Sequence, residues 1–208
     1  MKLVVLGANG QTGKCVLEAA LAKGMHVTAV IRSAKKHPGL QHDRLSVKIG
    51  DPTNPEFLRG VLVGQDAIVS TLGGRWPTKA STSIYFRSAS AIVEAARETD
   101  LERVLVTSTG LLFENQTVLG RLLRHMFPKT VSSASRMEQI LSQSGLNWTF
   151  VRPGCLNNKA ESNYRRKRDG MPVLGMSVSR KALARFLVDA IDKSETQCAV
   201  FGVACAVA

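Results

Sequence analysis

Three glycines near the beginning of the chain, Gly7, Gly10 and Gly13, have a spacing that is typical of a phosphate-binding turn. They follow a short apolar run at residues 2–6, and residues 14–23 directly after them predict a helix. A strand that turns into a helix leaves backbone N–H groups pointing outward, where the helix dipole also favours negative charge. The chemistry that this pattern predicts is binding of a pyrophosphate through the backbone.

These glycines follow the pattern G-x-x-G-x-x-G, whereas many dehydrogenases have G-x-G-x-x-G. Gly7 allows a sharp turn, Gly10 lets a phosphate approach the backbone, and Gly13 permits close packing of the helix on the strand. Such turns also occur for geometric reasons alone, but a following strand at residues 26–31 completes the unit that a dinucleotide requires. We expect the cofactor to contact these residues of the turn: Gly7, Asn9, Gly10, Gln11, Thr12 and Gly13.

Arg32 directly follows the second apolar run, and Lys35 and Lys36 are close by. In a dinucleotide fold the end of this strand lies beside the adenosine ribose, where an acidic side chain would bind the 2′-hydroxyl of NAD. A guanidinium suits the 2′-phosphate of NADP instead. We therefore predict NADP(H) as the cofactor, and an arginine that is merely exposed at a strand end is the alternative.

Asp51 follows a third apolar run at residues 45–49. At the end of this strand an acidic side chain can face the amino group of the adenine ring, and we place Asp51 in the cofactor site. Pro55 opens a helix shortly afterwards, so capping of that helix is the alternative role for Asp51.

The fourth predicted strand, residues 65–72, is followed by Gly73, Gly74 and Arg75. Glycines at the carboxyl end of a strand let the backbone approach a cofactor. Arg75 could reach the pyrophosphate or the substrate. We predict that Leu72, Gly73 and Arg75 line the cofactor site.

Three hydroxyl residues, Thr107, Ser108 and Thr109, follow the fifth predicted strand at residues 104–106. The carboxyl ends of parallel strands form the active-site edge of such folds, so Thr107 and Ser108 are predicted site residues. Hydroxyl groups in turns also bond to the local backbone, and this alternative remains open.

The sixth predicted strand, residues 147–151, ends in Arg152, Pro153 and Gly154. We expect it to end at the same edge of the sheet, and we predict that Pro153 and Gly154 contact the cofactor.

Ordinary short-chain dehydrogenases use a Tyr-x-x-x-Lys pair, in which the lysine lowers the pKa of the tyrosine that transfers the proton. This chain has two tyrosines; Tyr85 is followed four residues later by Ala89, and Tyr164 by Arg168. The missing pair disfavours alcohol–ketone chemistry. A flavin, quinone or linear tetrapyrrole suits such a site better, because it carries its own electron sink and can take its proton from water.

The remaining segments continue an alternation of strands and helices. We predict helices at 84–99 and 132–144, with an irregular or partly helical segment at 111–130 between them. Further along, we predict a β-hairpin that pairs 164–168 with 171–174. A helix at 179–193, with Ser179 as its N-cap, and a strand at 199–207 complete the predicted elements. The predicted fold is α/β, a Rossmann-like doubly wound and mainly parallel sheet with helices on both faces, in a single domain of residues 1–208.

With 208 residues, of which 44% are hydrophobic, the chain can form one domain with a full core. No apolar run reaches the roughly 18 residues of a membrane span, and Met1 leads directly into the first predicted strand, so we expect neither a span nor a targeting peptide. The cysteines are Cys15, Cys155, Cys198 and Cys205. Because none forms a C-x-x-C pair, we expect buried free thiols in the cytoplasm and no disulfide or metal site.

The net charge of +12 is compatible with nucleic acid, an acidic membrane surface or anionic small molecules as partners. Residues 164–168 (Tyr-Arg-Arg-Lys-Arg) could bind phosphates while the tyrosine stacks on a base, or could attract an anionic substrate. We favour an exposed edge strand whose charges discourage aggregation. The expected partner is a small-molecule hydride acceptor, without membrane or nucleic acid, and we expect a monomer or weak homodimer.

Two stretches carry a family resemblance: Gly-Ala-Asn-Gly-Gln-Thr-Gly at residues 7–13 and Ser-Gly-Leu-Asn-Trp-Thr-Phe-Val-Arg-Pro-Gly at residues 144–154. Together with Asp51, Gly73 and Ser108, they occur in the order that the family has. Over nearly its whole length the chain resembles the atypical short-chain dehydrogenase/reductases with an NAD(P)H-binding domain. Within them it is similar to the branch of flavin reductase (biliverdin reductase B) and its bacterial relatives.

The resemblance implies roles for individual residues. It implies that Gly10, Gln11, Thr12 and Gly13 hold the pyrophosphate, that Arg32 binds the 2′-phosphate, that Gly73 and Arg75 line the cofactor channel, and that Ser108 corresponds to an active-site serine. A histidine beside the nicotinamide in that reductase corresponds here to Gly154, which argues against biliverdin as the substrate.

We therefore expect an NADPH-dependent oxidoreductase that transfers hydride to a flavin-, quinone- or tetrapyrrole-like acceptor, with Ser108 as the catalytic residue. Ser108, Arg75 and Arg152 could orient the acceptor or offset charge on it. The alternative is a non-catalytic NADP-binding sensor, similar to fungal nitrogen-repression regulators of this fold. The missing Tyr–Lys pair is compatible with both.

Overall fold

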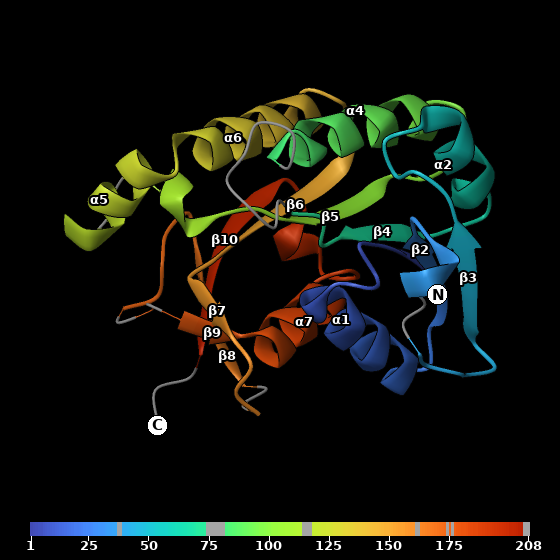
Figure 1. Ribbon diagram of the computed structural model, residues 1–208, viewed down its shortest axis with the longest axis horizontal. Coiled ribbons are helices and arrows are strands. Elements are labelled where there is room, and N and C mark those ends of the chain that lie inside the picture. The colour runs from blue at the N-terminus through green and yellow to red at the C-terminus, as the bar shows by residue number, and fades with distance from the viewer. Residues whose placement is uncertain are drawn as a thin grey trace.

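A mainly parallel β-sheet forms the central layer of the molecule (Figure 1). The structure is a computed structural model that describes residues 1–36, 39–73, 82–113, 118–160, 163–173, 175 and 177–205. Within these residues eight strands are joined in the order β3-β2-β1-β4-β5-β6-β10-β8. They are β1 (Lys2–Leu6), β2 (His26–Ile31), β3 (Leu45–Ile49), β4 (Ala67–Ser70), β5 (Arg103–Thr107), β6 (Asn147–Pro153), β8 (Tyr164–Arg168) and β10 (Ala199–Cys205). Neighbouring strands are parallel except β8 and β10, which are antiparallel.

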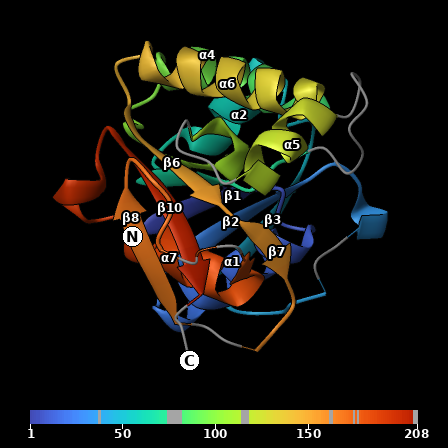
Figure 2. The same ribbon diagram turned by 90° about the vertical axis from the view of Figure 1, so that its left-hand side faces the viewer.

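Helices cover both faces of this sheet (Figures 1 and 2). They are α1 (Gln11–Ala22), α2 (Pro55–Leu62), α4 (Ile84–Ala96), α5 (Val118–Met126), α6 (Pro128–Ser142) and α7 (Arg180–Asp189), with 3-10 turns η1 (Ala34–Lys36), η2 (Gly110–Leu112) and η3 (Ser194–Thr196). α1 and α7 pack together on one face, while α2, α4 and α6 cover the other. A separate parallel pair joins β7 (Cys155–Asn157) to β9 (Ser177–Ser179). This architecture confirms the predicted fold class.

The central strand β1 shows why both faces of the sheet are covered. Leu3 and Val5 belong to the core beneath α1 and α7, whereas Val4 and Leu6 belong to the core beneath α2 and α4. All four side chains are fully buried. Strands of a parallel sheet that are buried on both faces have nearly continuous apolar sequences, and this is the physical origin of the first apolar run.

Helix boundaries agree with the sequence in some places and differ in others. α7 begins after Ser179, whose hydroxyl accepts a hydrogen bond from the Ala182 N–H at 3.0 Å, as predicted. α1 begins at Gln11, three residues earlier than predicted, because its first turn lies directly against the preceding loop. The described residues between 111 and 130 are partly helical, which was one of the two predicted alternatives, and they include α5.

The predicted hairpin is wrong. β8 pairs with β10 and not with residues 171–173, which form no strand. Asp169 and Gly170 do reverse the chain, and Asp169 has a positive φ of 53°. However, the long buried strand β10 offers a better partner than the short segment after the turn, and Gly202 of β10 lacks the Cβ that would lie 2.1 Å from the Gly170 carbonyl oxygen. The sequence predicted the turn correctly, but it did not predict that β8 pairs with β10.

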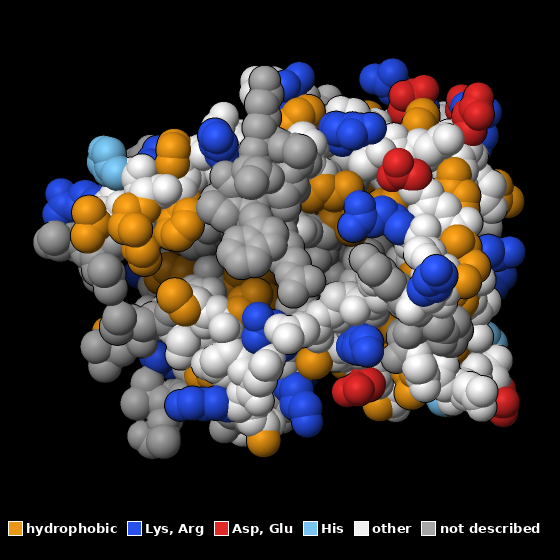
Figure 3. Space-filling model, in the orientation of Figure 1, with side chains coloured by type: hydrophobic (Ala, Val, Ile, Leu, Met, Phe, Trp, Pro, Cys, Tyr) orange, Lys and Arg blue, Asp and Glu red, His pale blue; other side chains and the backbone are white. Residues whose placement is uncertain are grey.

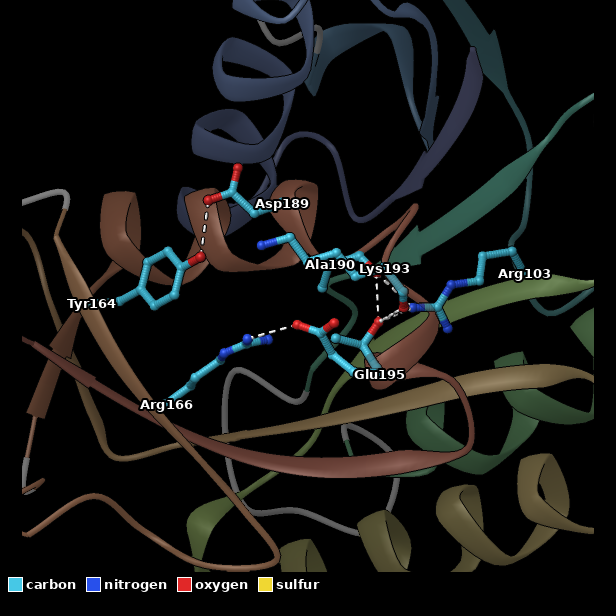
Figure 4. A network of polar contacts seen from close by, with 8 residues as sticks. Arg103, Tyr164, Arg166, Asp189, Ala190, Lys193 and Glu195 are labelled. Carbon is cyan, nitrogen blue, oxygen red and sulfur yellow. Dashed lines mark hydrogen bonds and ion pairs between the residues drawn. The ribbon is translucent and has the colours of Figure 1, made fainter.

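A buried arginine, Arg103, links β5 by hydrogen bonds to the segment that follows α7 (Figure 4). The Arg103 guanidinium donates to the carbonyl oxygens of Ile191, Asn147 and Ala190 at 2.8–2.9 Å and to the Thr196 hydroxyl at 2.9 Å. Arg103 is 7% exposed, and burial lowers its pKa to about 10. It is still cationic at neutral pH, and the four hydrogen bonds that stabilise this buried charge are made to neutral oxygens.

The four cysteines are free, in agreement with the prediction, but the expectation that they are buried is wrong, because Cys155 and Cys198 are exposed and Cys15 and Cys205 are only half-buried. Cys155 lies in the outer strand β7, and Cys198 occupies a left-handed position with φ 47° in a loop before β10. Among the helices of the described residues, none has the length and hydropathy needed to cross a bilayer.

Candidate functional site

The predicted site residues lie where strands end on one edge of the sheet. β1 and β4 are neighbours at the centre, and the chain continues from β1 to α1 on one face but from β4 towards α4 on the other. Such a switch point leaves a crevice beyond the carboxyl ends of the strands. The structure brings together at this edge the turn after β1 and the ends of β4, β5 and β6.

The turn after β1 has the geometry of a phosphate cradle. Gly7 adopts φ 79°, a conformation that favours glycine, and the Gly10 N–H donates to the Gly7 carbonyl oxygen at 2.9 Å. A Cβ on Gly13 would lie 2.1 Å from the same oxygen, so only glycine fits there. Gly10 is the N-cap of α1 and has no side chain to accept the first N–H groups of the helix. These N–H groups, from Gln11, Thr12 and Gly13, are therefore available for an anionic ligand.

Thr71 connects this turn to the end of β4, and sequence reasoning missed it. Its hydroxyl donates to the Leu6 carbonyl oxygen at 3.1 Å and lies 3.4 Å from that of Gly7. A Cβ on Gly7 would approach the Thr71 hydroxyl to 3.0 Å. The only signal in the sequence was a hydroxyl residue within the predicted fourth strand, and it gave no indication of a contact 64 residues away.

Arg32 and Asp51 follow the adjacent strands β2 and β3. Arg32 is exposed, as the 2′-phosphate role requires. The Asp51 carboxylate accepts hydrogen bonds from the Thr53 N–H and hydroxyl, both at 2.9 Å. The Thr53 backbone hydrogen bond, with smaller contributions from the charges of Arg87 and Arg32, holds the pKa of Asp51 below its usual value.

The alternative role of Asp51 as a helix cap is wrong. Asn54 is the N-cap of α2, and its side-chain oxygen accepts from the Phe57 N–H at 3.1 Å. Asp51 is instead bound in its own turn, where its Oδ1 atom accepts both hydrogen bonds from Thr53. The sequence contained both acceptors before Pro55, and only Asn54 has the spacing of an N-cap. A contact of Asp51 with adenine stays a prediction.

Among the three hydroxyls after β5, Ser108 differs from its neighbours. The Thr107 hydroxyl donates to the Ser70 carbonyl oxygen at 3.3 Å, and the Thr109 hydroxyl accepts from the Leu111 N–H at 3.3 Å. Thr109 thus follows the alternative of local backbone bonding, whereas Thr107 bonds to the backbone of the neighbouring strand β4, 37 residues away. The Ser108 hydroxyl is buried, in a residue that is 8% exposed, and has no hydrogen-bond partner among the described residues. A buried hydroxyl without a partner costs about 1–3 kcal/mol, so it marks a place for a bound polar group.

At the end of β6 the positive charge of Arg152 is already paired. Its Nε and Nη2 contact the two carboxylate oxygens of Glu138 in α6 at 3.0 and 2.5 Å, and its guanidinium lies 4.8 Å from the centre of the Phe113 ring. Glu138 is 7% exposed. Because two of the three guanidinium nitrogens face a carboxylate that neutralises the charge, the predicted role of Arg152 in offsetting charge on the acceptor is not supported by this geometry.

The remaining predicted residues are distributed around the same edge. Leu72 is half-buried and Gly73 is exposed, whereas Pro153 is buried against Gly110, where a Cβ would lie 2.8 Å from the Pro153 carbonyl oxygen. Gly154 follows, half-buried. The predicted residue Arg75 lies outside the residues that the structure describes.

The two tyrosines have different environments. A Cβ on Gly73 would lie 3.1 Å from the Tyr85 hydroxyl oxygen, so this phenol of α4 reaches the end of β4. Sequence reasoning set Tyr85 aside because it has no lysine partner. The Tyr164 hydroxyl donates to Asp189 at 2.9 Å, and burial, together with this hydrogen bond and the Asp189 charge, raises its pKa to about 12 (Figure 4). Tyr164 is thus a poor proton donor. It lies in β8, which pairs with β10 and does not form the predicted hairpin.

A groove of about 430 Å³ opens elsewhere, between α1 and α7. Its lining residues are Cys15, Glu18, Ala19, Lys23, Lys181, Arg185, Val188 and Asp189. Burial, followed by the nearby Glu18 charge, raises the pKa of the Cys15 thiol. None of the predicted cofactor residues lines this groove, so the candidate site is defined by the strand ends and not by this groove.

Comparisons with known proteins agree with the geometry. Residues 7–194 match a family model described as NAD(P)H-binding. An uncharacterised chloroplastic protein of Arabidopsis thaliana is 28% identical over 94% of this chain and 73% of its own. Among solved structures, an oxidoreductase of Lactococcus lactis superposes with a TM-score of 0.83 at 18% identity, covering 99% of this chain and 91% of the other. A short-chain dehydrogenase/reductase of Veillonella parvula, solved in complex with NADP, has a TM-score of 0.80 at 24% identity. The similarity covers 98% of this chain and 94% of the other. At these identities the two structures are evidence for the fold.

Proposed function

Because the chain belongs to the NAD(P)H-binding family, we propose that it is an NADPH-dependent oxidoreductase of the atypical short-chain type. Its acceptor is a molecule with its own electron sink, such as a flavin, quinone or tetrapyrrole. The family membership supports cofactor binding, and the missing Tyr–Lys pair among the described residues supports an acceptor that needs no strong protein acid.

The observation that supports the catalytic part of this proposal is the buried Ser108 hydroxyl, which has no hydrogen-bond partner in the described part of the chain. It lies at the end of β5, and the Ser108 N–H donates to the Val151 carbonyl oxygen at 2.7 Å, which holds its backbone on β6. Ser108 is thus a fixed donor at the edge where ligands bind in this fold. A fixed hydroxyl that faces a bound acceptor can donate a hydrogen bond where negative charge develops during reduction.

Each part of the site has a separate task. The N–H groups at the start of α1 bind the pyrophosphate, and Arg32 binds the 2′-phosphate. When bound, the cofactor supplies a hydride. Ser108 orients the acceptor and stabilises the negative charge that the acceptor gains, while water supplies the proton that the acceptor takes up. Arg75 stays a proposed contact to the acceptor or pyrophosphate.

Cofactor preference is tested by isothermal titration with NADPH and NADH. We expect NADPH to bind more tightly, and Arg32→Ala to weaken NADPH binding about tenfold while it leaves NADH binding unchanged, because only NADPH carries the 2′-phosphate. Lys48→Ala, which removes another exposed cation near the end of β3, is the control. Equal weakening for both cofactors would remove Arg32 from this role.

Turnover is tested by NADPH oxidation with flavins, quinones and tetrapyrroles. We expect Ser108→Ala to lower kcat at least about tenfold with its best acceptor, because a charge-stabilising hydrogen bond is lost. Ser135→Ala, an exposed serine of α6, should leave kcat unchanged. Unchanged turnover in Ser108→Ala would contradict the catalytic assignment without affecting cofactor binding.

A non-catalytic NADP sensor is the second candidate function. The paired Arg152–Glu138 side chains support it, because they leave the end of β6 without a free charge to act on an acceptor. Tight NADPH binding without oxidation by any acceptor in the screen would favour the sensor.

A further inference from the structure

Helix α5 has two chemically different sides. Arg121, Arg124 and His125 are spaced for one face of the helix, while Leu122 and Met126 lie one turn apart on another. Figure 3 shows hydrophobic side chains together with Lys, Arg and His side chains at the end of the molecule where Figure 1 places α5. The helix is therefore amphipathic.

Part of the apolar side of α5 is not buried against the described residues of the protein. Leu122 is 58% exposed and Met126 is 61% exposed, although both are large hydrophobic residues. α5 packs chiefly against η2 and the adjoining helix α6. A surface helix of a globular protein normally turns its apolar stripe towards the core. α5 therefore presents an apolar surface for which the described residues provide no cover.

Positive charge surrounds this apolar surface. Arg121, Arg124 and Lys129 are exposed, and α5 has no acidic residue in its first turn. The net charge of the chain is +12. A second copy of the chain is a poor partner for this surface, because two such helices would bring like charges together. The charge instead fits an anionic partner that also accepts apolar side chains.

We propose that α5 binds the surface of a membrane that contains anionic lipids. An amphipathic helix with basic residues on its polar face lies in the lipid interface and inserts its apolar side chains below the headgroups. The long arginine side chains can extend to lipid phosphates while Leu122 and Met126 are immersed. The absence of a long apolar run, from which we expected no membrane, concerns helices that cross a bilayer and not one that lies on its surface.

Membrane binding goes beyond the proposed function and has a consequence for it. The chain passes from the end of β5 through Ser108 and η2 before it reaches α5, so α5 is anchored close to the candidate site. A protein attached through α5 would keep this edge near the lipid surface, where a lipophilic quinone is available. This consequence rests on the proposed oxidoreductase function, whereas lipid binding itself does not.

Vesicle co-sedimentation of the full chain tests the proposal. We expect binding to vesicles of phosphatidylcholine mixed with phosphatidylglycerol and little binding to phosphatidylcholine alone, with binding weakened by added salt. The variant Leu122→Asp/Met126→Asp should reduce partitioning at least about tenfold, because two charged groups would have to enter the interface. Val63→Asp is the matched control, since Val63 is 67% exposed and follows α2 at the other end of the molecule.

A second pair of variants tests the charge. Arg121→Gln and Arg124→Gln should each reduce partitioning about fivefold, because each arginine near an anionic surface contributes on its own. Lys48→Gln and Arg97→Gln, which are exposed elsewhere, should change it little. Circular dichroism and NADPH titration of every variant verify that the fold and cofactor site are retained, so that a loss of lipid binding is assigned to the helix surface.

Three results would overturn the proposal. One is no binding to the anionic vesicles. Another is binding that the α5 variants leave intact but that neutralisation of Lys167 and Arg168 in β8 removes, because general charge attraction would then suffice. The third is a dimer in light scattering that Leu122→Asp/Met126→Asp dissociates, since a second copy would then cover α5.

Discussion

The two halves of the carboxyl edge are built in different ways. Around β1 the site consists of backbone: Gly7, Gly10 and Gly13 form the turn, and helix N–H groups face outward. Around β5 and β6 the site consists of side chains, namely the unpartnered Ser108 hydroxyl and the Arg152–Glu138 pair. The first half depends on contacts within a few residues, and the second on contacts between distant segments.

This difference explains what each half can tolerate. The glycine turn is expected to lose its geometry when a side-chain atom is added, because only glycine leaves the space that the neighbouring backbone occupies. A side-chain site fails when an atom is removed, because a buried polar group then loses its partner. The following predictions separate these two kinds of dependence, and they run from the largest expected effect to the smallest.

Replacement of Arg103 by leucine should have the largest effect on stability. It removes four hydrogen bonds to buried oxygen atoms, which should lower the free energy of unfolding by about 4 kcal/mol. Urea denaturation measures this change. Arg97→Leu, at an exposed position after α4, should cost far less. A loss below about 1 kcal/mol would show that the network is not a major source of stability.

Gly13→Ala should break the cradle. Its Cβ would lie 2.1 Å from the Gly7 carbonyl oxygen, so the turn must shift, at a cost of about 3 kcal/mol and with loss of NADPH binding. Thermal unfolding and titration calorimetry measure both effects. Gly60→Ala is the matched control, because the added Cβ meets no atom within 4 Å in helix α2, and it should stabilise the helix by up to about 1 kcal/mol.

Glu138→Gln should destabilise the second half of the edge by about 2 kcal/mol, because it leaves the mostly buried Arg152 without a counter-charge. The double variant Glu138→Gln/Arg152→Gln should cost less than the sum of the two single changes. Urea denaturation of all four proteins gives the coupling. Glu98→Gln, in the exposed pair with Arg59, should cost less than about 1 kcal/mol. Simple additivity in the buried pair would contradict the interaction.

The smallest effect concerns alkaline pH. The folded pKa of Tyr164 is about 12, above its usual value of 10.0, so its contribution to stability is present below about pH 10 and is lost as the pH rises towards 12. The difference in unfolding free energy between wild type and Tyr164→Phe should shrink across this range. Absorbance of the tyrosinate gives the titration directly. A transition of Tyr164 near pH 10 would contradict the burial and the hydrogen bond to Asp189.

Much of the fold could be predicted because it depends on local pattern. The apolar runs that become β1, β2 and β3 are each bounded by turn residues, and Ser179 has the spacing of an N-cap. The partner of β8 could not be predicted in this way. The Asp169-Gly170 turn is a genuine hairpin signal, but strand pairing is decided by which surface is available after the whole sheet has formed.

In the candidate site, too, the features that depend on local sequence could be predicted and those that depend on distant segments could not. Gly7 and Gly13 were identified because their backbone roles are determined within the turn. Sequence reasoning gave Ser108 no advantage over Thr107 and Thr109 beyond the family resemblance, since three adjacent hydroxyls look alike. Which of the three lacks a partner depends on atoms of β4 and η2, and only the structure reveals it.

From the sequence alone one could derive an α/β domain, a phosphate-binding turn and a cation at the end of the second strand, because each depends on residues that are neighbours in the chain. The tertiary structure decided that Arg152 is paired with Glu138, that Ser108 has no partner among the residues that the structure describes, and that Leu122 and Met126 of α5 are exposed. Burial and pairing are properties of distant segments brought together by the sheet. Their energies therefore depend on packing that a local pattern does not contain.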